Sequence, residues 1–400
     1  MFCGLDSDLY PLKSYGDVAY RVYGPWARHS INILQSIQLI FNVGILILSN
    51  GQSISQMSKG TICFIVCLVI FLVAGMVVGQ IRTLARFGWL ANIAVWINVL
   101  NMFFIMGVAA NSLPNYAAVQ AAYSIAPGPV HRSAGQPPGT SFIDALNGLN
   151  QAIYSFGGAM IFVEFMAEMR HPMDFWKALI IATCFIYFVY MFFGLFVYSY
   201  QGQYAFNPAM QGLSPYGWQT VGNVLNVITG LIAACLYGNI GLKVLYVSVL
   251  EEFFHAPSLI KKAGKIFWVG LIPVYWALAF VIAAAIPQFS YLSGLIGALC
   301  ILQFTYTFPP ILYLGYQIKK DAMLPSEQMD VHGNYNREDS GMTRWIRGYK
   351  RRWLMNSFNV FYALGAATTA VLGIYSSIKS LIGAFNGTSV ATSFGCAAPV

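Results

Sequence analysis

The stretch Ala178–Tyr200 reads ALIIATCFIYFVYMFFGLFVYSY and contains no charged residue. About 20 apolar residues in a helix cross the ~30 Å hydrocarbon core of a bilayer. A helix satisfies all its backbone hydrogen bonds within the segment, which an isolated strand in lipid does not. The stretch therefore predicts a transmembrane helix.

Eight further charge-free apolar runs lie on either side of it, so the sequence predicts an all-α membrane protein of about nine transmembrane helices. The chain is 58% hydrophobic and only 9% charged, whereas soluble domains carry roughly 25% charged residues. Composition therefore argues against a soluble protein. The eight runs are Ile31–Ser49, Thr61–Gly79, Phe87–Ala110, Leu146–Val163, Val221–Leu242, Ile266–Ile286, Tyr291–Ile318 and Leu354–Ile378.

The basic residues are distributed unequally between the two sides of the predicted membrane. Of 22 Lys and Arg, 18 fall on one side, and only Lys59, Arg132 and Lys379 fall on the other, while Lys243 lies at a helix end. Basic loops stay in the cytosol. We therefore expect a cytosolic segment 1–30, a membrane domain 31–382 with a cytosolic loop 319–353, and an extracytosolic tail 383–400. The net charge of +8 thus reflects topology, and no nucleic-acid partner is expected.

The cysteines show no disulfide or metal-binding pattern. Five lie in apolar runs, where we interpret them as small buried side chains, and Cys3 and Cys396 fall on opposite sides of the predicted membrane. The five are Cys63, Cys67, Cys184, Cys235 and Cys300. The tail holds one N-glycosylation sequon, Asn386-Gly387-Thr388, on the side where it could be used.

Within the cytosolic loop, Trp345, Tyr349 and Trp353 recur every four residues among basic residues. This spacing predicts a helix at the membrane surface. Such a helix either anchors the topology or binds anionic lipids.

Two predicted helices carry polar stripes, which are costly in hydrocarbon unless they face a cavity or one another. Each stripe either lines a substrate path or joins helices through hydrogen bonds. One consists of Gln35, Gln38 and Asn42, and the other of Asn223, Asn226 and Thr229.

The run Leu146–Val163 contains Ser155-Phe156-Gly157-Gly158 near its middle. Adjacent glycines weaken a helix by about 1 kcal/mol each. They mark either a discontinuous helix whose freed backbone groups bind a substrate or close packing on small residues. Glu164 follows at one end of this run, and we expect it to pair with Lys243 or to carry a proton, because an unpartnered charge is costly there.

Motifs of soluble enzymes are missing: the sequence has no P-loop, no GxGxxG and no HExxH. We therefore expect no enzyme activity, no cofactor and no metal.

Several segments resemble the amino acid/auxin permease family. Glu168-Met169-Arg170-His171-Pro172-Met173-Asp174-Phe175 is similar to the loop after that family's sixth helix, and Gln80-Ile81-Arg82-Thr83-Leu84 resembles the loop before the fifth. The segments 11–17, PLKSYGD, and 32–38, NILQSIQ, are similar to filamentous-fungal neutral amino acid permeases. The resemblance covers essentially the whole chain.

The resemblance implies a leucine-transporter-type bundle of eleven helices with a five-plus-five inverted repeat, and a substrate held against broken first and sixth helices. The sixth matches Tyr154–Met160. Met1–Asp6 resembles the end of the second helix, so we expect this sequence to lack the first two helices and its cavity to be open on one side.

The resemblance implies proton-coupled symport of neutral, possibly aromatic, amino acids, in the plasma membrane rather than the vacuolar membrane. The expected partners are amino acid, protons and the lipid bilayer. Two other hypotheses stay open: an amino-acid-sensing receptor on the same fold, and an inactive truncated permease. The expected substrate-binding residues are Gln35, Gln38, Tyr154, Ser155, Phe156, Gly157, Gly158, Asn223 and Asn226, with Glu164 and Lys243 for coupling.

Overall fold

A computed structural model of the chain describes residues 1–7, 11–81, 84–137, 139–251, 255–257, 261–286, 288–327, 338–386 and 393–398, the side chains of 84–87, 168 and 248–249 excepted. In these ranges the chain forms helices and connecting loops, and a β-bridge joins Pro114 and Leu213. The predicted all-α class is confirmed. Arg82, Arg337 and most of the sequon Asn386-Gly387-Thr388 lie outside the described residues.

Seven helical stretches of the described chain are long and apolar enough to cross a membrane. Six are α3 (Pro25–Met57), α5 (Leu84–Asn111), α9 (Phe175–Gln201), α10 (Tyr216–Leu245), α11 (Lys262–Ala285) and α15 (Trp353–Asn386). The seventh runs from Phe289 to Asp321 and comprises α12 (Phe289–Ile296), the π-helical η6 (Gly297–Ile301) and η7 (Gln303–Thr307), and α13 (Phe308–Asp321). The apolar helix α4 (Phe64–Val78) has only 15 residues.

Shorter elements connect these helices. They are α1 (Phe2–Leu5), α2 (Tyr15–Tyr23), α6 (Tyr116–Tyr123), α7 (Phe142–Ser155), η1 (Ala159–Ile161), α8 (Phe162–Glu168), η2 (Pro172–Asp174), η3 (Gly202–Tyr204), η4 (Ala209–Gly212), η5 (Tyr246–Glu251) and α14 (Met342–Arg351).

Helix α3 runs through the centre of the bundle. It begins with Pro25, a residue favoured at the first helical position, and it packs against α2, α4, α10 and α11. The largest buried cluster joins α3, α4, α10 and α11 to α12 and η6. Packing is close: a Cβ on Gly75 of α4 would lie 2.1 Å from the ring of Trp276 of α11.

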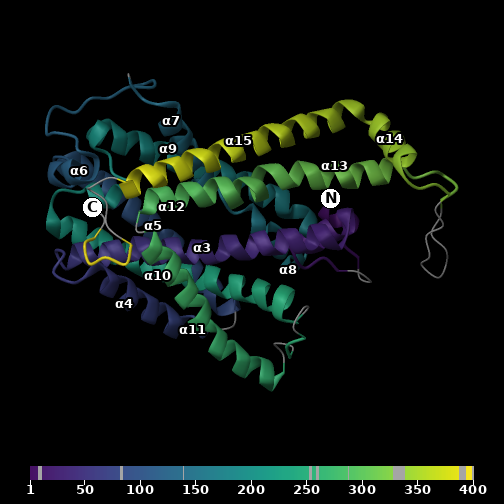
Figure 1. Ribbon diagram of the computed structural model, residues 1–400, viewed down its shortest axis with the longest axis horizontal. Helices are drawn as coiled ribbons and strands as arrows, with labels where there is room; N and C mark the ends of the chain where they lie inside the picture. The colour runs from purple at the N-terminus through teal and green to yellow at the C-terminus, as the bar shows by residue number, and fades with distance from the viewer. Residues whose placement is uncertain are drawn as a thin grey trace.

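The two ends of the bundle differ (Figure 1): α14 lies at one end, and the yellow C-terminal tail lies at the other, near α6. At the tail end, Cys63 and Cys396 form a disulfide across 333 residues of sequence. The expectation that Cys63 is an isolated buried thiol and that Cys396 has no partner is therefore wrong. Sequence spacing could not show this pair, because the fold alone brings the start of α4 to the tail. We call this the disulfide end.

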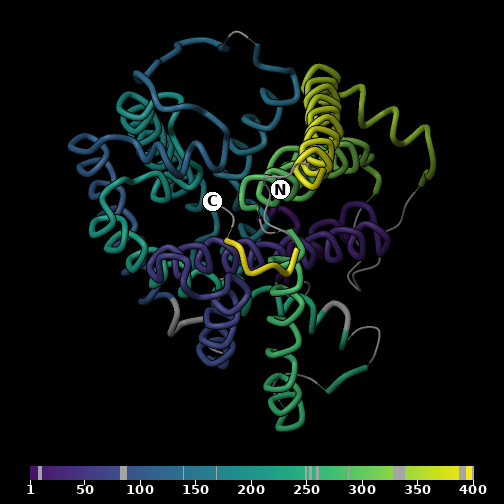
Figure 2. Tube along the Cα trace, turned by 60° about the vertical axis from the view of Figure 1, so that its left-hand side comes forward, coloured from purple at the N-terminus to yellow at the C-terminus, as the bar shows by residue number. Residues whose placement is uncertain are grey.

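The tail is also held by backbone hydrogen bonds. The Phe64 N–H donates to the Cys396 carbonyl at 2.9 Å, and the Phe394 N–H donates to the Ala284 carbonyl at 3.0 Å. Figure 2 shows the yellow tail crossing the ends of α4 and α11. It joins two helices that are far apart in sequence.

At the α14 end, charged side chains join Glu327 and Asp339 to α14. Arg344 donates to the buried carboxylate of Glu327, and Arg347 donates to Asp339 at 2.7 Å. Hydrogen bonds from Arg347 and then Arg344 hold the pKa of the Asp339 carboxyl below its usual range.

The predicted surface helix is shorter than its aromatic spacing suggests. The backbone leaves the helical region at Arg352 (φ −134°, ψ 47°), so Trp353 begins α15. Trp345 and Tyr349 share α14, but Trp353 belongs to the next helix. Nε of Arg352 lies 3.2 Å from Oδ2 of Asp321. This ion pair joins the boundary between α14 and α15 to α13.

Candidate functional site

The helix predicted over Leu146–Val163 is broken. Helix α7 ends at Ser155, and α8 begins at Phe162 after the single turn η1. Between them Phe156 (φ −96°, ψ 11°) and Gly158 (φ −177°, ψ −10°) depart from helical geometry. Among the described residues, no side chain caps the start of η1 or α8. Backbone N–H groups at a helix start lack partners within the helix. The break therefore supplies backbone polar groups in the middle of an apolar run.

The two adjacent glycines have different surroundings. A Cβ on Gly157 would lie 2.7 Å from Cγ2 of Ile301 in η6, so Gly157 is required for close packing. A Cβ on Gly158 would meet no atom within 4 Å. Packing therefore explains Gly157, whereas Gly158 faces open space.

Gln35 of α3 holds the C-terminal side of this break. Its side chain is fully buried, and Nε2 donates to the Met160 carbonyl at 3.2 Å and to Oε1 of Glu164 at 3.0 Å. Met160 belongs to η1 and Glu164 to α8. A single amide of the central helix therefore holds both the turn and the short helix that follows it.

Several buried oxygens near Gln35 have no hydrogen-bond donor among the described residues. They are Oε1 of Gln35, Oε1 of Gln38, Oδ1 of Asn42 and Oε2 of Glu164. Buried polar atoms are nearly always paired with protein, water or a ligand. This row of acceptors along α3 is therefore suited to a hydrogen-bond donor such as an ammonium group.

Aromatic side chains flank the break. The ring of Phe156 lies edge-on to that of Tyr190 of α9, with 5.5 Å between their centres. Tyr154 is half-buried, and it packs against the main core and against Gly297 of η6. The Ser155 hydroxyl donates to the Ala152 carbonyl of its own helix at 2.7 Å. Tyr154 and Phe156 thus provide apolar surface, whereas the Ser155 hydroxyl bonds to a carbonyl of its own helix.

The polar stripe of α10 lies elsewhere. Asn223 donates to Gln56 at 3.0 Å, and Asn226 donates to the Ser53 hydroxyl at 3.1 Å. Ser53 lies 18 residues after Gln35 on α3, or roughly 27 Å at 1.5 Å per residue. The structure therefore does not bring Asn223 and Asn226 together with the break, and their amides join α10 to α3.

Of the two predicted coupling residues, Glu164 touches the site directly through Gln35. Lys243 lies in the last turn of α10. The pairing of Glu164 with Lys243 stays a prediction.

Sequence reasoning missed Asn150, which anchors α7 to α15. Its side chain is fully buried, and Nδ2 donates to the Gly373 carbonyl at 3.0 Å and to the Ser377 hydroxyl at 3.1 Å. The available signal was the small-residue face of Gly373, Ser376 and Ser377 on the last helix, which permits close approach. This anchor holds one half of the broken helix while the other half depends on Gln35.

The fold and site define an integral membrane protein of the helical class, with one broken crossing element beside buried amides. Residues 10–329 match the sequence profile of the family described as transmembrane amino acid transporter protein, and the chain belongs to that family. The family is one of transporters, not of enzymes.

Three fungal proteins are similar to this chain. A protein of Fusarium pseudograminearum (strain CS3096), named transmembrane transporter, is 24% identical over 391 residues, which are 95% of this chain and 73% of the relative. A transmembrane transporter of Gibberella moniliformis (strain M3125 / FGSC 7600) is 24% identical over 74% of this chain and 61% of its own length. The N amino acid transport system protein of Neurospora crassa is 24% identical over 76% of this chain and 63% of its own length.

Proposed function

We propose that the protein is a secondary active transporter that carries neutral amino acids, aromatic ones included, together with protons. The observation that supports this most is the break between α7 and α8, with Gly158 facing open space and Gln35 bonded to η1 and α8 on its C-terminal side. Broken helices in transporters bind substrates near the middle of the membrane. The family supplies the substrate class.

The proposal assigns each group at the site a task. Backbone N–H groups around Gly158 bind the carboxylate of the amino acid. The unpaired oxygens of Gln35 and Gln38 accept hydrogen bonds from its ammonium group. Tyr154 and Phe156 contact an apolar side chain. Gly157 keeps the break against η6.

We assign proton coupling to Glu164. Its Oε1 accepts from Gln35, and its Oε2 has no donor among the described residues. A proton on this carboxylate removes the negative charge that Gln35 contacts, and it thereby weakens the link between α3 and α8. Lys243 remains a proposed ion-pair partner.

For the membrane topology we propose nine crossings, which are the seven long helices, α4 and the α7–α8 pair, as part of an inverted-repeat bundle. The α14 end, rich in Arg and Lys, lies in the cytosol. The disulfide end lies outside, because disulfides persist in oxidising compartments. Domain limits at 31 and 382 and a location in the plasma membrane complete this proposal.

Reconstitution tests the function. Purified protein in liposomes should accumulate radiolabelled phenylalanine or leucine when the outside is acidic, and a protonophore should abolish the accumulation. Equal uptake with and without the gradient would exclude proton coupling. Binding without any flux would favour the receptor hypothesis instead.

A further inference from the structure

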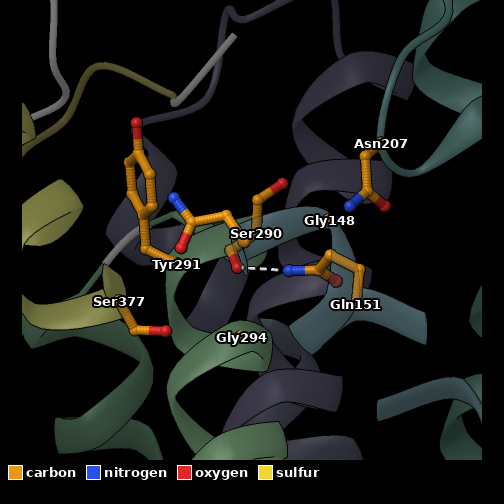
Figure 3. Close-up of a pocket in the computed structure, with 8 residues that line it drawn as sticks. Gly148, Gln151, Asn207, Ser290, Tyr291, Gly294 and Ser377 are labelled. Atoms are coloured by element: carbon orange, nitrogen blue, oxygen red, sulfur yellow. Dashed lines mark hydrogen bonds between the residues drawn. The ribbon is translucent and has the colours of Figure 1, made fainter. Parts of the chain in front are cut away.

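A separate cavity lies beside α7, and Figure 3 draws residues that line it. It has a volume of about 170 Å³ and lies between α7, α12 and α15. Its lining consists of Asn147, Gly148, Gln151, Asn207, Ser290, Tyr291, Gly294 and Ser377. None of these eight residues carries a charge.

Hydrogen bonds hold the walls of this cavity. Gln151 Nε2 donates to the Ser290 carbonyl at 2.6 Å, as Figure 3 shows, and its Oε1 accepts from the Ser293 hydroxyl at 3.0 Å. Asn147 Nδ2 donates to the Ser380 hydroxyl at 2.7 Å. Three helices are thus tied together around the cavity, so its shape is built into the fold.

The remaining polar groups suit a small ligand. The Ser377 oxygen accepts from Asn150 at 3.1 Å, and a hydroxyl that accepts can still donate. Tyr291 and Asn207 also line the space. The wall therefore offers both donors and acceptors, but no fixed charge to balance a net anion or cation.

The volume sets the size of the ligand. About 170 Å³ exceeds by roughly tenfold the ~10–15 Å³ that a single water requires. It is well below the ~300–1,000 Å³ of sites for drug-sized molecules. A molecule with a handful of heavy atoms and no net charge fits these limits.

The cavity and the break share α7. Asn147 lies eight residues before the end of this helix at Ser155, or roughly 12 Å along it. We propose that the cavity is a second binding site for a small neutral amino acid, which the substrate occupies before it reaches the break. This inference rests on the proposed function.

Gly294→Leu tests the cavity directly. A Cβ at Gly294 would lie 3.4 Å from both Gln151 Nε2 and Ser377 Oγ, so a larger side chain fills the space. We expect wild-type protein in lipid nanodiscs to bind two molecules of radiolabelled alanine per chain, and Gly294→Leu to bind one. Gly365→Leu is the control, because Gly365 of α15 faces open space; it should bind two.

A second variant guards against misfolding of the first. Asn207→Leu combined with Tyr291→Phe removes hydrogen-bonding groups at the rim, and it should weaken one of the two binding events about tenfold. The inference would be overturned if both variants still bound two molecules of alanine as wild type does. It would also be overturned if wild type bound only one molecule and Gly294→Leu left that binding unchanged. In both cases the proposed function stands. If wild-type protein binds no amino acid, both fail.

Discussion

The polar stripes of α3 and α10 look alike in sequence and behave differently in the fold. Asn223 and Asn226 of α10 donate to Gln56 and Ser53, and these hydrogen bonds join the two helices near the disulfide end. Nearer the other end of α3, Gln35 donates to Met160 and Glu164 on the C-terminal side of the broken helix, and oxygens of Gln35 and Gln38 stay without donors among the described residues.

The difference shows how one helix performs two tasks. A polar group that is paired with a neighbouring helix stabilises the bundle. Because Oδ1 of Asn223 also lacks a donor among the described residues, the contact of Gln35 with the broken helix, and not its unpaired oxygen, separates the two stripes. We therefore assign the half of α3 nearer the disulfide end to structure and the half around Gln35 to binding. The following predictions test this division, from the largest expected effect to the smallest.

Gly158→Leu should abolish uptake, with a decrease of at least about tenfold, while the thermal unfolding temperature stays that of wild type. No atom lies within 4 Å of the new Cβ. The leucine therefore fills the space proposed for substrate without a clash at its Cβ. Proteoliposome uptake measures the effect, and Gly365→Leu is the control; full uptake by Gly158→Leu would contradict the assignment.

Gln35→Met should reduce uptake about tenfold and also lower stability. The change keeps the length of the side chain but removes the donor to Met160 and Glu164. Leaving buried acceptors unpaired costs about 1–3 kcal/mol. Uptake and thermal unfolding should be measured on the same preparation. An uptake rate within twofold of wild type would remove Gln35 from the site.

Asn226→Leu should leave uptake within about twofold of wild type and lower stability slightly. Interhelical hydrogen bonds in membranes contribute ~0.6 kcal/mol on average and up to ~1.7 kcal/mol, and this change removes the bond to Ser53. If Asn226→Leu lost uptake to the same extent as Gln35→Met, the division between the two halves of α3 would be wrong.

Much of the fold could be predicted from the sequence, because hydrocarbon allows few backbone arrangements. Charge-free runs located the long helices, and the Gly157-Gly158 pair located the break. The Cys63–Cys396 disulfide could not be predicted, since it depends on where the tail ends in space. The helix end at Arg351 was missed because the aromatic period continues across it.

The candidate site could be predicted only in part. The three-residue spacing placed Gln35 and Gln38 on one face of their helix. The same spacing placed Asn223 and Asn226 on one face of a different helix. Periodicity shows that side chains share a face, but it does not show what that face meets. The anchoring residue Asn150 was missed for the same reason, since its three-residue spacing from Asn147 does not show that both side chains meet α15.

Cysteine protection at the break tests the central claim most directly. Gly158→Cys in proteoliposomes should react with a membrane-permeant maleimide, because its Cβ faces open space. Mass spectrometry of the peptide that contains residue 158 separates this reaction from reactions of the native thiols. The account predicts that saturating phenylalanine slows alkylation at position 158 at least about fivefold, while arginine has no effect. Equal rates with and without phenylalanine would show that the break does not bind the substrate.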